Sequence, residues 1–255
     1  MTSLRSRLYL STLCDDAPRL AQAHGLGLEL VEFCTPVNLD ENFDHWHALA
    51  SHRMAHASRW ILHAPFAELS PCAIDPLVRQ VARRRLLQTA QLCIRYGISR
   101  MVVHSGFIPH IYFPEWFVEQ SALFFRDLLA QLPASFQLLI ENVLDPDPYP
   151  LLEMVDAIGD PRVGLCLDVG HAHASSSVPV EDWLDALAPR LWHLHIHDND
   201  STFDAHLPPG QGSIGFPGLF ERIFSRAPRA TLTCECPDAT GCIRQLQAYG
   251  LLAAH

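Results

Sequence analysis

Short apolar runs alternate along the chain with longer amphipathic segments. Strands are predicted at 7–13, 27–33, 59–63, 100–104, 137–141, 163–168, 191–197 and 230–235. Helices are predicted near 16–24, 42–57, 75–96, 115–131, 150–158, 180–188, 217–226 and 240–248. Because the strand-like runs are apolar on both faces, they are typical of a parallel sheet covered by helices. The alternation therefore predicts an α/β fold, a closed (β/α)8 barrel.

The boundaries between these segments agree with the alternation. Asp75 precedes Pro76 as a helix N-cap precedes a proline in the first turn, and Gly97 follows the third predicted helix. Ser/Gly-rich linkers, low-complexity segments and internal repeats do not divide the chain. We therefore expect a single domain over residues 1–255.

Metal-binding types of side chain stand at or just beyond the ends of six of these runs. They are His63, His104, Glu141, Asp168, His171, His195, Asp204, His206 and Glu235. The carboxyl ends of barrel strands meet on one face, so these side chains are expected to converge there. Buried imidazoles and carboxylates are costly when isolated and are stabilised when they share cations. The pattern predicts a metal site at the mouth of the barrel.

Each residue also has a simpler interpretation when it is taken alone. A lone histidine such as His63 or His104 is more often a hydrogen-bonded core residue than a ligand. A turn past Gly170 could direct Asp168 and His171 to one cluster, but Asp168 could equally be a helix N-cap with His171 on the surface. Asp204 and His206 lie in a glycine-rich loop. Their shared position after strand ends favours the metal site over these alternatives.

The segment LWHLHIHDND carries the densest group of imidazoles. Because side chains alternate along a strand, one face is expected to carry His193, His195 and His197. The opposite face, toward the helices, is expected to carry Trp192, Leu194 and Ile196. At least one of the histidines is expected to be a ligand, with His195 at the best depth. His197 and Asp198 are expected to hold the ligands in place from behind.

The amino-acid composition excludes several classes of enzyme and argues against some partners. All 18 basic residues are arginines, so lysine-dependent Schiff-base chemistry, pyridoxal phosphate attachment and a P-loop are excluded. The formal charge of −10 argues against a protein that tracks duplex DNA. The sequence has no apolar stretch long enough for a membrane span, and a secretory signal is not expected, because only a short apolar run precedes Asp15 and Asp16.

The eight cysteines are scattered and form no CxxC pair, which argues against a zinc ribbon. Several lie in apolar runs and are interpreted as small core residues in a reducing, cytoplasmic protein. If Glu235 points into the barrel, then Cys234 and Cys236 face the helix layer and are not ligands.

From about Trp60 to Pro237 the chain resembles the xylose isomerase-like TIM-barrel superfamily, also called the AP endonuclease family 2 fold. All nine zinc positions of the endonuclease IV pattern have the same residue type here. The resemblance implies one ion held by His63, His104 and Glu141. It implies a second held by Glu141, Asp168, His195 and Glu235, and a third held by His171, Asp204 and His206.

The sugar and sugar-phosphate isomerase and epimerase branches are similar over a smaller set. By that likeness Glu141, Asp168, His195 and Glu235 would bind one metal, with His171 near the substrate. The chain departs from both patterns. It lacks the basic face and DNA-penetrating loops of endonuclease IV, and residues 198–202 lack the arginine that epimerases often carry there. Segments 62–71 and 102–117 are loosely similar to cobamide-remodelling phosphodiesterases of the same superfamily.

Two enzymatic functions therefore stay open. The first is hydrolysis of a small or cofactor-type phosphodiester by a site with two or three ions, zinc before Mn, Mg or Co. The second is isomerisation or epimerisation of a sugar with one ion, where Glu141 and Glu235 would act as acid and base. A slight preference goes to hydrolysis, because it uses all nine residues. The expected catalytic residues are Glu141, Glu235 and His171.

Other functional classes fit less well. A barrel that binds a metal or ligand without catalysis would not need so many titratable groups at its strand ends. A serine hydrolase would need a GxSxG elbow, which Ser105-Gly106 does not provide. The expected partner is a small molecule, a phosphodiester or a sugar, without duplex DNA or membrane. The sequence leaves the oligomeric state open.

Overall fold

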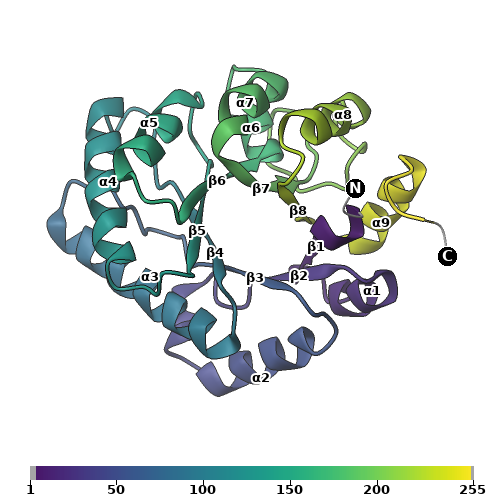
Figure 1. Cartoon of the computed structure of the whole chain (residues 1–255), viewed down its shortest axis with the longest axis horizontal. Coiled ribbons are helices and arrows are strands. Elements are labelled where there is room, and N and C mark those ends of the chain that lie inside the picture. The colour runs from purple at the N-terminus through teal and green to yellow at the C-terminus, as the bar shows by residue number, and fades with distance from the viewer. Residues whose placement is uncertain (1–3, 254–255) are drawn as a thin grey trace.

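A computed structural model describes residues 4–253 and shows the predicted alternation of strands and helices (Figure 1). The strands are β1 (Leu8–Ser11), β2 (Gly27–Leu30), β3 (Trp60–His63), β4 (Arg100–His104), β5 (Gln137–Glu141), β6 (Val163–Asp168), β7 (Leu191–Ile196) and β8 (Thr231–Cys234). Every neighbouring pair is parallel, and β1 also pairs with β8, which closes the barrel. The (β/α)8 prediction is confirmed.

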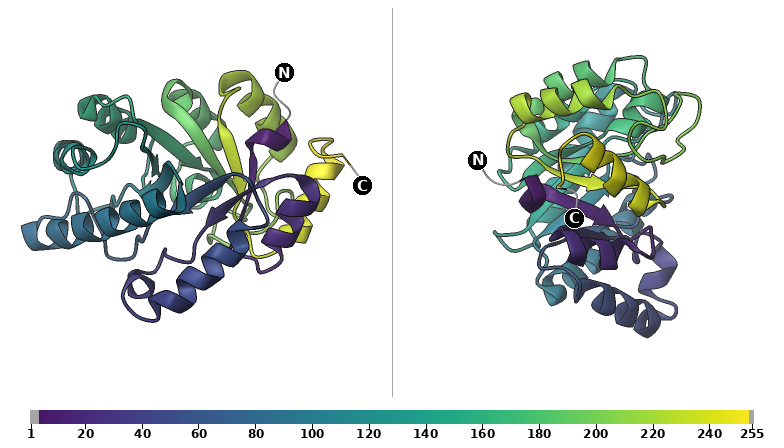
Figure 2. Two further views of the ribbon diagram at one scale, coloured as in Figure 1. Left: turned by 60° about the horizontal axis from the view of Figure 1, so that its bottom comes forward. Right: turned by 90° about the vertical axis from the view of Figure 1, so that its right-hand side faces the viewer.

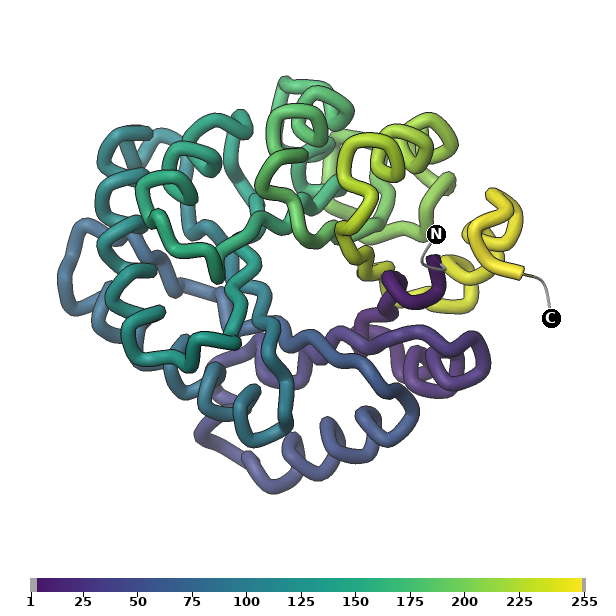
Figure 3. Tube along the Cα trace, in the orientation of Figure 1, coloured from purple at the N-terminus to yellow at the C-terminus, as the bar shows by residue number. Residues whose placement is uncertain are grey.

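The helices form a ring outside the barrel (Figures 1 and 2). The α-helices are α1 (Ala17–His24), α2 (Phe43–Met54), α3 (Pro76–Tyr96), α4 (Pro114–Leu129), α5 (Tyr149–Ile158), α6 (Val169–Ser175), α7 (Val180–Leu187), α8 (Phe216–Arg226) and α9 (Ala239–Ala248). Short 3₁₀ turns cover Leu4–Arg7, Pro36–Leu39 and Ala188–Arg190. The first and last strands, β1 and β8, lie side by side, as the Cα trace shows (Figure 3).

One helix was not predicted. The sequence suggested a turn after Asp168, but the chain enters α6 at the next residue. The Asp168 side chain accepts a hydrogen bond from the backbone N–H of His171, as an N-cap does. His171 therefore lies in the first turn of a helix and not in a loop. The same carboxylate starts this helix and faces the barrel mouth.

The core has two parts. A large apolar layer fills the space between the strands and the helices, and it includes Leu194 and Ile196 as predicted. A small cluster fills the barrel interior away from the carboxyl ends of the strands. It is formed by Tyr9, Ile61, Val102, Leu139 and Cys166. Above this cluster the inward positions of the strands are polar and buried. The barrel is therefore a closed core that carries its polar groups toward one end.

The predicted position of Trp192 is wrong. Leu165 pairs with Leu191 and Cys166 with His193, so β7 has one extra residue opposite β6. This bulge turns the Trp192 side chain away from the helices and against the small interior cluster. Gly164 leaves room for it, because a Cβ there would lie 2.2 Å from the Trp192 ring.

Cysteine chemistry is also partly different from the prediction. Cys72, Cys93, Cys166 and Cys234 are free and buried, as core residues should be. The sulfur atoms of Cys236 and Cys242 lie in contact, which the scattered cysteine pattern did not indicate. Cys234 and Cys236 pack in the helix layer, as expected for an inward Glu235. Within residues 4–253, helices of the length and apolar character needed to cross a membrane are absent.

Candidate metal centre

The nine side chains singled out from the sequence converge at the carboxyl ends of the strands. They form three groups, and within each group one potential ligand atom per residue lies within 4.8 Å of the others. The groups are His63, His104 and Glu141; then Glu141, Asp168, His195 and Glu235; then His171, Asp204 and His206, joined by His197. Glu141 at the end of β5 belongs to two groups and links them. Whether these groups hold ions stays a prediction.

The central group surrounds one nitrogen of His195. Its Nδ1 lies 2.9 Å from Glu235 Oε2, 3.0 Å from Glu141 Oε1 and 3.5 Å from Asp168 Oδ2. The carboxylates come from β5, β6 and the residue after β8. His195, Glu141 and Asp168 are fully buried. Carboxylates this close repel one another unless a positive charge lies between them.

The second group lies beside β3 and β4. His63 Nε2 is 3.2 Å from Glu141 Oε2, and His104 Nε2 is 3.5 Å from the same oxygen. The ring of Phe66 stacks on His104 with centroids 4.3 Å apart, which fixes one face of this imidazole. Each Glu141 oxygen therefore faces a different group, as a bridging carboxylate would.

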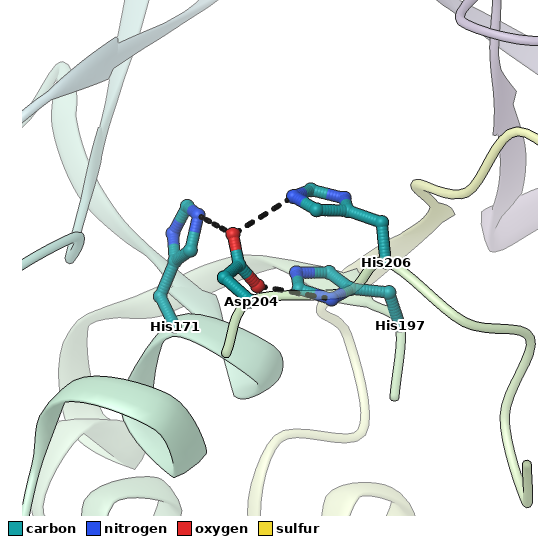
Figure 4. Close-up of side chains that lie close together, drawn as sticks. All are labelled: His171, His197, Asp204 and His206. Atoms are coloured by element: carbon teal, nitrogen blue, oxygen red, sulfur yellow. Dashed lines mark hydrogen bonds and ion pairs between the residues drawn. The ribbon is translucent and has the colours of Figure 1, made fainter. Parts of the chain in front are cut away.

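The third group lies nearest the solvent and combines α6 with the loop after β7 (Figure 4). Asp204 Oδ2 is 3.0 Å from His206 Nε2 and 3.3 Å from His171 Nε2. The rings of His197 and His206 stack with centroids 3.9 Å apart. His206 has φ 47°, in the left-handed region that an ordinary residue adopts at a cost of about 1 kcal/mol. Such strain is typical of functional positions.

Three of the imidazoles share a common orientation, in which one ring nitrogen points to a fixed protein acceptor and the other points into the centre. Nδ1 of His63 donates to Ala64 O at 2.9 Å, that of His171 to Asn142 O at 3.0 Å, and that of His206 to Glu235 O at 2.8 Å. Histidine ligands of protein metals are usually held this way, which fixes the tautomer and directs the free nitrogen to the ion.

The electrostatics of the centre are dominated by burial and by mutual attraction. Burial alone would raise the pKa of Glu141, but the facing His195 holds it well below its usual range. Burial lowers the pKa of His104 to about 3, so its imidazole is neutral. The pKa of His206 is raised to about 9, because its bond to Asp204 and the nearby carboxylates outweigh burial. Groups that stabilise each other's charge in this way are common at functional sites.

The residues fit divalent ions. His197 Nδ1 and Asp204 Oδ1 are buried without hydrogen-bond partners among the described residues, and they face each other across 3.6 Å. Two ligands bound at about 2.1 Å in a tetrahedral site stand about 3.4 Å apart. The donor set of imidazole nitrogens and carboxylate oxygens suits zinc and also Mn or Co. His197 lies both behind Asp168, at 2.9 Å, and beside the third group.

Two residues that support the centre were not found by sequence reasoning. Asn142 brackets the end of β6, since its side chain accepts from Asp168 N and donates to Asp168 O. Glu29 is fully buried inside the barrel and lies 2.9 Å from His195 Nε2. A charged residue inside the apolar run GLEL was the available signal. Asp198 was predicted, and it organises the loop that carries Asp204 and His206.

An apolar cavity of about 220 Å³ adjoins the second group. Of the aromatic residues that follow strands in the sequence, Phe66, Phe107 and Tyr112 line it, beside His104.

The fold and this centre together define a (β/α)8 barrel protein of the class that carries its chemistry at the carboxyl ends of the strands. The chain belongs to the xylose isomerase-like TIM-barrel family, whose family model matches residues 20–251. Members of this superfamily are enzymes, including epimerases and endonuclease IV.

Individual relatives are distant in sequence. The chain is 27% identical over 174 residues to the uncharacterized protein MJ1311 of Methanocaldococcus jannaschii, covering 64% of this chain and 59% of that protein. It is 27% identical over 165 residues to a probable endonuclease 4 of Mycobacterium leprae, covering 60% of this chain and 64% of that protein. The matched part of the chain thus spans less than two thirds of the length of each of these curated relatives.

Solved structures are similar over nearly their whole length. The TTHB071 protein from Thermus thermophilus, soaked with ZnCl2, has a TM-score of 0.74 at 29% identity, with 96% of this chain and 97% of that one covered. A D-tagatose 3-epimerase-like protein has a TM-score of 0.76 at 20% identity, with 95% and 96% covered. The second likeness concerns the fold alone.

Proposed function

We propose that this protein is a hydrolase of a small or cofactor-type phosphodiester that uses two or three divalent ions, zinc first. The observation that carries the proposal is the convergence of all nine strand-end residues in three groups, two of which share Glu141. Similarity to a probable endonuclease 4 supports it. With a single ion, the third group would serve only as substrate contacts, although its Asp204 Oδ1 is buried without a hydrogen bond among the described residues.

The chain's own residues would divide the work. His63, His104 and Glu141 would hold one ion, the central group a second, and His171, Asp204 and His206 a third. Divalent ions in such sites activate water and neutralise the charge that develops on phosphorus oxygens. Glu141 would keep the ions at fixed separation, and Glu235 and His171 would hold or move protons at the reacting oxygens.

The substrate is proposed to be a small diester and not duplex DNA. The protein carries a formal charge of −10, which disfavours a phosphate backbone many nucleotides long. The cavity beside His104 is lined mainly by apolar side chains, among them Leu69, Val78 and Ile108. An apolar part of one ester group would pack there while the phosphate meets the metals.

Isomerisation or epimerisation of a sugar is the second candidate. The central group alone matches a one-metal site, and structures of epimerases share the fold. Glu141 and Glu235 both approach His195 Nδ1, so they lie near one point where they could act as acid and base.

Metal content and two variants distinguish these functions. Zinc, Mn, Mg and Co are quantified by elemental analysis in the purified protein, and bis(p-nitrophenyl) phosphate and ketoses are tested as substrates. Hydrolysis predicts two or three zinc ions per chain. His206→Ala should then lose about one ion and diester turnover by roughly 100-fold or more. Glu235→Gln should abolish either activity.

His173→Ala is the matched control, since His173 lies on α6 as His171 does but bonds Ser213 at 2.9 Å. It should keep the metal content and rate of the wild type. Near-normal diester turnover by His206→Ala would contradict the hydrolase, and a single Mn or Mg ion with ketose turnover would favour the isomerase.

A further inference from the structure

A buried carboxylate lies beneath the metal centre, inside the barrel. Glu29 stands within β2 and is fully buried. Its Oε1 lies 2.9 Å from His195 Nε2, and its Oε2 lies 3.1 Å from His193 Nε2. The hydroxyl of Thr233 donates to Oε2 at 2.5 Å. Glu29 thus joins β2 to β7 and β8 across the interior.

A carboxylate in such a place must be compensated. Its oxygens are hydrogen-bond acceptors, and Oε1 faces His195 Nε2 while Oε2 faces His193 Nε2 and the hydroxyl of Thr233. Both imidazoles therefore present an N–H to Glu29. For His195 this settles the orientation of the ring: Nε2 carries the proton toward Glu29, and Nδ1 is left facing Glu141, Asp168 and Glu235.

The hydrogen bonds continue away from the centre. His193 Nδ1 lies 2.6 Å from Thr231 Oγ1, and Arg100 Nη1 donates to the same hydroxyl at 3.2 Å. Arg100 begins β4, at the end of the barrel opposite the metal centre. The contacts of His193 with Thr231 hold its ring in place. Glu29 is therefore held both by His193 and by Thr233. Fixed carboxylates behind ligating histidines raise the basicity of the ligand and define its direction.

We propose that Glu29 is a positioning residue of the metal centre, which binds the Nε2–H of His195 and so presents Nδ1 of that ring to the ion. The inference rests on the proposed metal centre but not on which reaction occurs there, because His195 belongs to the central group in both candidate functions.

The contacts of Glu29 argue against a second role, that of a direct metal ligand. Glu29, His63 and His195 also have potential ligand atoms within 4.8 Å of one another, as direct ligands of one ion would. However, Glu29 already receives Thr233 and His193 on Oε2, and His63 Nε2 points to Glu141 at 3.2 Å. The atoms that a further ion would need are therefore engaged in other contacts.

The test measures metal binding and not activity. Zinc affinity and stoichiometry are determined by competition with a chromophoric chelator for the wild type, Glu29→Gln and Glu29→Ala. Glu29→Gln is isosteric and keeps an acceptor for His195, so it should fold and bind zinc roughly 3- to 10-fold more weakly. Glu29→Ala should bind roughly 10- to 100-fold more weakly, with the number of ions unchanged. The visible spectrum of the cobalt-loaded protein should change in both variants.

Glu32→Gln is the matched control. Glu32 follows β2, is also buried, and pairs with Arg53 at 2.9 Å instead of with a histidine of the centre. It should keep wild-type zinc affinity and cobalt spectrum. In the zinc-loaded wild type, ¹⁵N NMR of histidine should show His195 protonated at Nε2. Glu29→Ala should weaken the downfield shift of that proton.

The outcomes separate cleanly. Zinc affinities of Glu29→Gln and Glu29→Ala within about twofold of the wild type would overturn the proposal. Loss of one whole zinc ion with the rest unchanged would also overturn it, since Glu29 would then be a ligand. A wild type that retains no divalent ion would overturn both this proposal and the metal centre. A wild type that binds zinc and shows the Glu29 effect, but hydrolyses no diester, would remove the proposed hydrolase and leave this inference standing.

Discussion

The loop that carries Asp204 and His206 depends on one buried carboxylate, and its replacement gives a sharp prediction. Asp198 is fully buried just after β7. Its Oδ1 accepts from the backbone N–H of Asn199 at 2.9 Å and of Ile214 at 3.1 Å. Its Oδ2 accepts from Gly210 at 2.8 Å and Gly212 at 2.9 Å. The carboxylate thus holds both ends of the loop.

Asp198→Asn changes one oxygen into an NH2 group and leaves the shape of the side chain unchanged. With the remaining oxygen at Oδ1, the amide would meet the N–H donors of Gly210 and Gly212, and those two bonds would be lost. A net contribution of about 1.5 kcal/mol for each bond to a charged acceptor gives a loss of about 3 kcal/mol in the free energy of unfolding. The loop should also loosen, so the third group should bind its ion more weakly.

Urea unfolding of the zinc-loaded and zinc-free proteins measures the first effect, and zinc stoichiometry measures the second. Asp200→Asn is the control, because Asp200 is exposed and its carboxylate bonds the neighbouring Thr202. It should change stability by less than about 0.5 kcal/mol. An Asp198→Asn protein that keeps wild-type stability and zinc content would refute the claim that this carboxylate organises the loop.

Three further predictions concern other parts of the site. Gly170→Ala should remove zinc from the third group, because a Cβ at this position would lie 1.9 Å from the His197 ring. The control Gly218→Ala should keep the zinc, because no heavy atom would lie within 4 Å of its Cβ. Burial raises the pKa of Asp145 to about 6, so its contribution to stability is present at low pH and is lost as pH rises through that value. Between about pH 4 and pH 7, the free energy of unfolding of Asp145→Asn should therefore rise by about 2 kcal/mol relative to that of the wild type, as measured by urea unfolding of the metal-free protein. Plots of unfolding free energy against pH that run parallel for the two proteins would contradict this prediction. Ile108→Ser should raise KM for diesters with an apolar group but not for dimethyl phosphate, and equal effects on both would argue against the cavity as a binding site.

The barrel could be predicted because its signal is repeated. Each strand is a mainly apolar run, and each is followed by a helical segment, so an error in one element does not change the number of predicted strands. The wrong predictions concern residues whose conformation depends on tertiary contacts and not on the local sequence pattern. The one-residue bulge at Trp192 leaves no mark in the apolar pattern, and it reverses the side chain. The helix α6 was missed because Asp168 was considered either as an N-cap or as a metal-site residue, and the structure gives it the N-cap bond while it faces the centre.

The site could be predicted only where chemistry coincides with a strand end. Glu141 and Glu235 stand at such ends, and the closure of the barrel brings them together regardless of loop details. Glu29 lies deeper, within a run that alternation cannot distinguish from core. Its partner residues gave a usable clue, since inward histidines such as His193 must bond something. Finding that partner required the register between β2 and β7, which are not neighbours in the sheet.

The number of ions is the property that best separates the possible functions, and the structure gives a physical reason. A single ion in the central group would satisfy Glu141 and Glu235 and would leave Asp204 without a metal ion. Asp204 has one buried oxygen without a hydrogen bond among the described residues, and it is carried by a loop that includes the strained backbone of His206. Strain and an unpaired acceptor both cost free energy, and a metal ion in the third group would offset both. For that reason the loop between β7 and α8, more than the central group, is the part of the barrel where hydrolase and isomerase can be told apart.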